Sequence, residues 1–207
     1  MPAARAKPRR RQPRQARAVE TRATIIEAAA RVLSRRGYAG TTTNHIAERA
    51  GVSIGTLYEY FRDKDQLVTA VVDAHLAAGE ALLAERTAAL DLGAPLPEVV
   101  AALVGGMIAL HAADPRLHRV LTAEVPHVRA NVARAEALEE RMIVVLTAAL
   151  AQRADVTVRD PALAARVCVH TVEALTHRWV VDARGAPATP ATLSDELVRL
   201  VVAYLCA

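Results

Sequence analysis

Two threonines, Thr43 and Thr56, stand in the expected first turns of two neighbouring short helices. Hydroxyl groups and the free backbone N–H groups of a helix N-terminus can both hydrogen-bond to a phosphate. Gly55, directly before Thr56, lets the backbone come close to a ligand, because any side chain there would enlarge the separation. These residues therefore predict contacts with nucleic-acid phosphates, which position a protein without specifying a base sequence.

The two threonines belong to the stretch TTTNHIAERAGVSIGTLYEYFRDK, residues 41–64, which has the pattern of two helices separated by a short turn. The inward faces of these helices are formed by Ile46, Ala47 and Ala50, and by Leu57 and Phe61. Gly51 predicts the end of the first helix, because glycine adopts the left-handed conformation without a Cβ penalty, and Ser53 follows as an N-cap. So short a turn holds the second helix at a steep angle, with its N-terminal end free to enter a major groove. The pattern predicts a helix-turn-helix.

Further helices are expected on both sides of this motif. The preceding one covers residues 19–36, where apolar residues recur with helical spacing, and a glycine ends it. Tyr38 is then expected to pack against the domain, and Thr42 to cap the next helix. Asp63 is the expected N-cap of a long helix over residues 64–89.

Residues 20–75 resemble the DNA-binding domain of the tetracycline-repressor (TetR) family. The similarity lies in the GY pair after the first helix, the threonine run, IAxxAGVS, GTLYxYF and the K-x-x-L start of the long helix. It implies an all-α fold with an N-terminal three-helix helix-turn-helix domain and a larger helical ligand-binding and dimerisation domain. The expected organisation is a disordered basic arm (1–17), a DNA-binding domain (18–64) and an effector-binding and dimerisation domain (65–207).

The resemblance also implies which residues contact DNA. The positions that face base edges or thymine methyl groups are Asn44, Ser53, Ile54 and Tyr58, and those that reach phosphates are Tyr60 and Lys64. Ile54 departs from the family pattern, because an aliphatic side chain offers only methyl contact and leaves more of the recognition to DNA shape. Tyr58 and Tyr60, taken alone, would be ordinary packing aromatics. The full expected contact set is Thr42, Thr43, Asn44, Ser53, Ile54, Gly55, Thr56, Tyr58, Tyr60 and Lys64.

The composition favours packed helices and places the positive charge at the N-terminus. Of the 207 residues, 53% are hydrophobic but only 3% are aromatic, which suits helix packing better than strands. Seven of the 26 basic residues lie in residues 1–17, which contain no acidic residue. This Pro- and Arg-rich segment is either a solvated arm or one that follows phosphates, and its place beside a helix-turn-helix favours the second interpretation.

Several features of the sequence bear on location. The basic start lacks the apolar segment of a signal peptide, and no stretch is expected to span a membrane. Cys168 and Cys206 are the only cysteines, as expected in a reducing compartment. We interpret them as small buried hydrophobic residues, with a redox-sensing pair as the alternative. The expected location is the cytoplasm.

The remainder of the chain predicts five more helices, over residues 96–112, 115–122, 126–153, 160–183 and 191–206, several with proline near the start. The last two have wide apolar faces, formed by Leu163, Val167, His170, Ala174 and Leu175, and by Leu193, Leu197, Leu200, Val201, Tyr204 and Leu205. Such faces either complete the subunit core or bind a second subunit. The resemblance favours a homodimer through a four-helix bundle of these two helices.

The resemblance implies a small-molecule cavity among the helices of residues 96–183. The candidate effector-binding residues are Met107, His111, Met142, Glu173, His177 and Trp179. Trp179 is interpreted more readily as a core or interface anchor than as a stacking platform. Seven histidines suggest a metal, but His111 and His118 lie seven residues apart across a proline, and no helix carries a typical ligand pair. Neither a metal nor a cofactor is expected.

No nucleophile motif, glycine-rich phosphate loop or close acid–base pair occurs in the sequence, so it does not indicate an enzyme. Two functions remain. One is a ligand-responsive repressor that binds a palindromic operator as a homodimer and is released by an effector; the other is a ligand-independent architectural DNA-binding protein. A cavity in the helical domain would favour the first, and a closed core the second.

Overall fold

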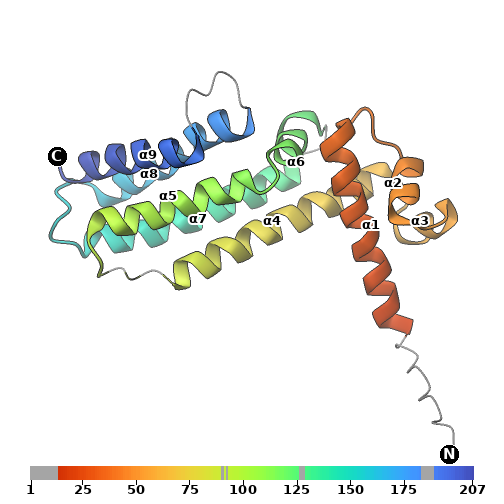
Figure 1. Cartoon of the computed structure of the whole chain (residues 1–207). Coiled ribbons are helices and arrows are strands. Elements are labelled where there is room, and N and C mark those ends of the chain that lie inside the picture. Colours follow the sequence, from red (N-terminus) through yellow and green to blue (C-terminus); the bar gives the residue numbers. More distant parts are fainter. Residues whose placement is uncertain (1–13, 90, 92, 126–128, 183–188) are drawn as a thin grey trace, which may run out of the picture.

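The structure is a computed structural model that describes residues 14–89, 91, 93–125, 129–182 and 189–207. Every regular element within these residues is helical, which confirms the expected all-α fold. The first three helices gather at one end of the molecule, and the others form an elongated bundle (Figure 1).

The N-terminal unit contains α1 (Arg14–Arg36), α2 (Thr43–Ala50) and α3 (Ile54–Tyr60). Its core is formed by fully buried apolar side chains, which include Ile25, Leu33, Ile46, Leu57 and Phe61. The apolar positions inferred from helical spacing therefore do face inward.

Helix α1 begins five residues earlier than the sequence suggested. The expectation of a disordered arm up to residue 17 is therefore wrong for residues 14–17, which are helical. These residues follow Pro13 and are Arg, Gln, Ala and Arg, all good helix formers, so the helix extends toward the proline. Residues 1–13, the rest of the expected arm, lie outside the described residues.

Helix α4 (Lys64–Ala88) joins the two parts of the molecule (Figure 1). Its first half supplies Leu67, Val68 and Val71 to the core of the N-terminal unit. The domain boundary expected after residue 64 thus falls inside α4, whose first half still belongs to the core of the N-terminal unit. A displacement of the second half of α4 would be transmitted to the N-terminal unit through a continuous helix.

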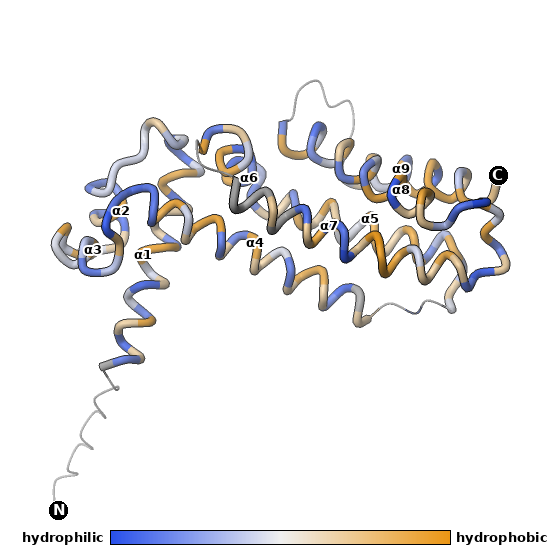
Figure 2. The backbone as a smooth tube through the Cα atoms, turned by 180° about the vertical axis from the view of Figure 1, so that it is seen from behind, coloured by the Kyte–Doolittle hydropathy of each residue, from blue (hydrophilic) through white to orange (hydrophobic). Residues whose placement is uncertain are grey.

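The bundle is completed by α5 (Leu96–Ala112), α6 (Pro115–Arg119) with the π-helical turn η1 (Val120–Glu124), α7 (Arg129–Ala151), α8 (Pro161–Thr176) with the π-helical turn η2 (His177–Val181), and α9 (Pro190–Leu205). Helices α5 and α9 pack closely, as do α7 and α8. Their apolar side chains meet inside the bundle, where Leu96, Ile108, Leu193 and Leu197 are buried. Figure 2 shows apolar positions recurring along the helices of the bundle. A second core thus forms, separate from that of the N-terminal unit.

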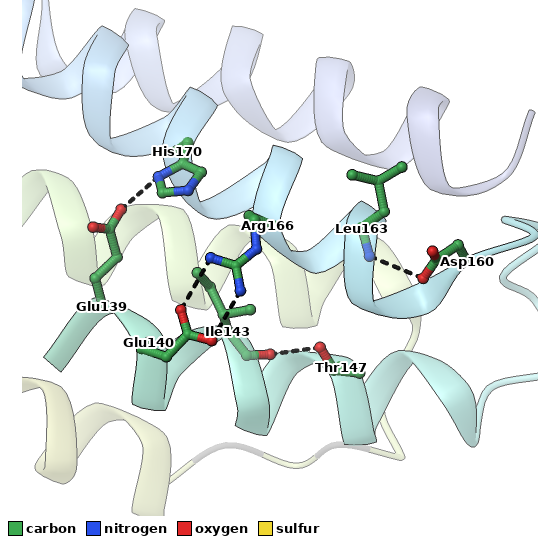
Figure 3. A network of polar contacts seen from close by, with 8 residues as sticks. All are labelled: Glu139, Glu140, Ile143, Thr147, Asp160, Leu163, Arg166 and His170. Atoms are coloured by element: carbon green, nitrogen blue, oxygen red, sulfur yellow. Dashed lines mark hydrogen bonds and ion pairs between the residues drawn. The ribbon is translucent and has the colours of Figure 1, made fainter. Parts of the chain in front are cut away.

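Polar contacts on the surface join α7 and α8 (Figure 3). Arg166 Nη1 and Nη2 lie 3.0 and 2.8 Å from the two carboxylate oxygens of Glu140, and His170 Nδ1 lies 2.7 Å from Glu139 Oε1. His170 was expected on an apolar face, but its side chain is half-exposed and faces this carboxylate. Exposed ion pairs contribute little to stability, so the apolar core between the helices does most to hold them together.

The expectation that no stretch reaches a membrane-spanning length is wrong for helix α4. By length and composition, residues 64–86 could cross a membrane. The same holds for α5 taken together with α6 and η1, although the two halves of this pair are bent by 80° relative to each other. Core helices have the same properties. Because α4 packs against α1, α5 and α7, length and composition alone do not make it a membrane span.

Candidate DNA interface and effector cavity

The turn between α2 and α3 has the local structure that the sequence predicted. Thr42 caps α2 by accepting a hydrogen bond from the backbone N–H of His45 at 3.3 Å. Gly51 ends α2 with φ of 70°, in the left-handed region. Ser53 caps α3 by accepting from the backbone N–H of Thr56 at 3.0 Å. These three residues set the angle at which α3 leaves the turn.

The side chains around the start of α3 form an exposed polar and apolar surface. Tyr58 is 50% exposed, and its hydroxyl lies 3.2 Å from Thr43 Oγ1, which joins the starts of α2 and α3. Ile54 is 39% exposed, and Asn44 and Gly55 are also exposed. The surface therefore presents hydroxyl and amide groups beside an aliphatic group, as contact with phosphates, base edges and thymine methyl groups requires.

Two predicted DNA contacts also have a structural role in the N-terminal unit. Tyr60 is partly buried and packs against the core. Lys64 Nζ donates a 2.6 Å hydrogen bond to the backbone carbonyl of Tyr38. It also lies 3.8 Å from the centroid of the Tyr38 aromatic ring. An ammonium group has three donors, so Lys64 retains capacity for a phosphate.

Tyr38 connects three parts of the molecule, a role that the sequence did not reveal. Its hydroxyl donates to Asp65 Oδ1 at 2.6 Å, and this carboxylate raises the pKa of Tyr38 to about 12. Its backbone N–H donates to Glu124 Oε2 at 2.9 Å, at the end of η1. Ser34 makes a second link across this boundary through a 3.1 Å bond to Asp114. The N-terminal unit is thus tied to α6 and η1 as well as to α4.

A cavity of about 470 Å³ lies inside the helical bundle. Its walls come from α4, α5, α7, α8 and α9, and its volume is within the usual range for small-molecule sites. Of the predicted effector residues, Met107 and Met142 line it. The other four, His111, Glu173, His177 and Trp179, are not among its lining residues. Trp179 instead packs against the second core, in agreement with its interpretation as an anchor.

Four histidines that are distant in the sequence meet at the junction of the two parts. His118 on α6 has its ring centroid 4.7 Å from that of His111, 5.3 Å from that of His75 and 5.5 Å from that of His177. His75 Nε2 and His118 Nδ1 are 3.1 Å apart, so one ring donates and the other accepts. His111 Nδ1 donates to the carbonyl of Met107 at 2.9 Å. The cluster joins α4, α5, α6 and η2.

Burial lowers the pKa of three of these imidazoles. It lowers the pKa of His118 to about 3, with further lowering by its three histidine neighbours. The pKa values of His75 and His111 are also lowered by burial, opposed by the negative charges of Asp114 and Glu173, respectively. These three rings are therefore neutral near pH 7.

No three described His, Cys, Asp or Glu residues are arranged to hold a metal ion. Cys168 lines the cavity and is buried, and burial raises the pKa of its thiol to about 11. The reactive thiolate is thus disfavoured there. Cys206 is exposed, so the expectation that both cysteines are buried is wrong for Cys206.

The apolar faces of α8 and α9 are only partly used inside the subunit. The side chains buried against the second core are Leu193, Leu197, Val201 and Leu205. The large apolar side chains left exposed are Leu163 and Val167 on α8 and Leu200 and Tyr204 on α9. We call these four exposed residues the α8–α9 face. Exposed apolar groups on adjacent helices are typical of a surface that binds another chain.

The sequence matches two family descriptions that together span most of the described chain. Residues 25–71 match the bacterial regulatory proteins of the tetR family, and residues 95–205 match the tetracyclin repressor-like C-terminal domain. The second match alone covers more than half of the chain. The protein belongs to the TetR family of transcriptional regulators, whose members bind operator DNA.

Similarity to individual curated proteins extends over only part of the chain. The HTH-type transcriptional regulator TtgR of Pseudomonas putida is 54% identical over 56 residues, which is 27% of each chain. AcrR of Shigella flexneri is 39% identical over 54 residues, 26% of this chain and 25% of AcrR. The chain thus aligns with only about a quarter of the length of these curated relatives.

Solved structures share the fold over nearly the whole chain. A TetR-like regulator from Rhodococcus sp. RHA1 has a TM-score of 0.67 at 24% identity and covers 92% of this chain and 96% of its own. FadR from Bacillus subtilis, solved in complex with stearoyl-CoA, has a TM-score of 0.66 at 22% identity, with 88% and 98% covered. At these identities the similarity establishes the fold alone.

Proposed function

We propose that this protein is a ligand-responsive transcriptional repressor that acts in the cytoplasm. It binds a palindromic operator as a homodimer and is released when a small molecule occupies the cavity. The observation that carries this proposal is the 470 Å³ cavity, because α4 lines it with Glu80, Leu83 and Ala84 and also begins directly after the DNA-reading helix. An architectural DNA-binding protein would need no such cavity.

The contacts with DNA follow from the exposed surface at the starts of α2 and α3. Thr43 approaches phosphates, while Asn44, Ile54 and Tyr58 face the edges and methyl groups of bases, with the Tyr58 hydroxyl held beside Thr43. Ser53 already accepts the capping bond of α3, so its main role is to orient this helix. Sequence preference then comes from few base contacts and from DNA shape.

Two routes connect the cavity to the reading helix. The first is α4 itself, which runs unbroken from the cavity wall to Lys64. The second passes from α5, which lines the cavity, to α6, which packs against it; the α6–η1 segment is held to the N-terminal unit by the Ser34–Asp114 and Tyr38–Glu124 hydrogen bonds. A ligand that fits only one arrangement of these helices shifts the population toward it, and thereby changes the separation of the two reading helices in the dimer.

The α8–α9 face is the proposed dimer interface. Pairing these two helices with their copies across a two-fold axis buries Leu163, Val167, Leu200 and Tyr204 together. Such symmetry presents two reading helices to two half-sites related by the same axis. The proposal therefore links the apolar face of the bundle to the palindromic form of the operator.

DNA selection tests the operator-binding half of this proposal. The purified protein is incubated with random duplexes, and bound DNA is amplified and sequenced over several rounds. We expect an enriched palindrome whose half-sites lie about one helical turn apart, roughly 10 to 10.5 base pairs, or a multiple of it. Enrichment of bent or A·T-rich DNA without a palindrome would instead support the architectural function.

A further inference from the structure

The chemistry of the cavity wall indicates what kind of molecule it accepts. Apart from Glu80, Arg141 and Arg153, all lining residues among those described are Leu, Val, Ala, Met or Cys. An aromatic ligand would find no ring to stack on, and polar groups along a ligand would lose their hydrogen bonds without replacement. The wall therefore favours a flexible aliphatic chain.

The lining positions also define an elongated shape. On α5 they recur through three turns, from Leu96 to Met107, with Val100 and Val104 between them. The eleven steps of helix from Leu96 to Met107 correspond to about 16 to 17 Å at about 1.5 Å per residue. Along α7 the lining extends from Leu138 to Leu150, close to the end of the helix. A ligand can therefore lie along the bundle as an extended chain.

The two lining arginines differ in how firmly they are held. Arg153 is only 14% exposed and binds Asp155 through two atoms, at 2.8 and 2.7 Å. Arg141 is 66% exposed, and its Nη2 lies 3.3 Å from Glu80 Oε1, longer than a usual charge-assisted hydrogen bond. A guanidinium offers five N–H donors, so Arg141 can bind a further anion at the exposed side of the cavity.

We propose that the cavity binds an aliphatic chain with an anionic headgroup, a fatty-acid-like molecule, and that this headgroup takes the place of Glu80 at Arg141. The inference rests on the proposed function, because it names the effector class of the same cavity. Glu80 belongs to α4 and Arg141 to α7, so the exchange removes an ion pair between these helices when the ligand binds. The headgroup thereby acts on the helix that carries the DNA-binding unit.

The test compares three probes with the same twelve-carbon chain: dodecanoate, dodecanol and dodecyltrimethylammonium. Affinities are measured by calorimetry on the full-length protein. We expect dodecanoate to bind most tightly. Arg141→Gln should lower its affinity about tenfold, as expected for loss of a charged hydrogen bond, without a change for dodecanol. Glu80→Gln should raise the affinity for dodecanoate, because the competing carboxylate is gone.

Arg166→Gln is the matched control, because Arg166 also forms an ion pair between two helices at the surface, here α8 and α7, but does not line the cavity. It should leave all three affinities unchanged. Equal binding of dodecanoate and dodecanol would overturn the headgroup assignment and leave the proposed function intact. Tightest binding of the cation, lost in Glu80→Gln, would also overturn it. If no probe binds, the proposal of an aliphatic ligand is wrong, and binding of other classes of small molecule then tests whether the cavity is an effector site.

Discussion

The carboxylate of Glu124 accepts a 2.9 Å hydrogen bond from the backbone N–H of Tyr38, and so joins the end of η1 to the turn between α1 and α2. The fit is close, because a Cβ on neighbouring Gly37 would lie 2.7 Å from Glu124 Oε2, and Gly37 has φ of 69°. Glycine is thus required there both by backbone conformation and by this contact.

Removal of this link should loosen the junction. Glu124→Ala deletes the acceptor for Tyr38 N–H and should lower the free energy of unfolding by about 1 kcal/mol, the usual net value of such a bond. Urea denaturation followed by circular dichroism measures the change. Glu136→Ala, at an exposed position on α7, is the matched control. Equal stability of both variants would show that the bond does not hold the two parts together.

Tyr58 should contribute to operator binding through both its ring and its hydroxyl. Tyr58→Ala should weaken binding to the selected operator by about 1 to 3 kcal/mol, the range for a specific DNA contact. Tyr58→Phe keeps the ring and loses only the hydroxyl beside Thr43, so its loss should be smaller. A fluorescence titration measures both affinities, with circular dichroism as the folding control. Unchanged affinity for Tyr58→Ala would mean that α3 is not the reading helix.

The histidine cluster should make the protein less stable in acid. An unfolded histidine has an ordinary pKa near 6.5, whereas that of His118 in the folded protein is about 3. The unfolded state therefore binds more protons between these values, and stability is full above about pH 6.5 and falls as the pH drops toward 3. The slope from one such histidine is at most about 1.4 kcal/mol per pH unit.

Denaturation of the protein and of His118→Gln at pH values from about 7.5 to about 4.5 measures this effect. The variant should lose stability less steeply, because glutamine does not titrate. His170→Gln is the control, since His170 is exposed and lies outside the cluster. Parallel curves for the protein and His118→Gln would assign the acid sensitivity to other groups.

The dimer proposal is tested at Leu200, which is 50% exposed on the α8–α9 face. Leu200→Asp places a charge in the proposed interface and should convert a dimer of twice 22.1 kDa to a monomer in sedimentation experiments. Val144→Asp, on an exposed position of α7, should leave the dimer intact. Leu197 is unsuitable for this test because it is buried in the subunit core. A dimer that survives Leu200→Asp would place the interface elsewhere.

Features set by neighbouring residues were predictable from the sequence. Gly51 and Ser53 determine the turn before α3 through their own conformation and a bond three residues away, so local spacing revealed them. The cavity wall and the histidine cluster were not located, because their members come from separate helices. His75 and His177 are about a hundred residues apart, and no local pattern indicates that His118 lies between them.

Release of the operator by a ligand in the cavity tests the central claim most directly. The protein is bound to its selected operator and titrated with dodecanoate, dodecanol and naphthalene, alongside two tryptophan variants. Leu103→Trp fills the cavity, whereas Val144→Trp adds the same side chain to an exposed position outside it. We predict that at least one probe weakens operator binding of the protein and of Val144→Trp about tenfold or more, and leaves Leu103→Trp bound. Release of Leu103→Trp at the same probe concentrations would contradict the proposal that the cavity controls DNA binding.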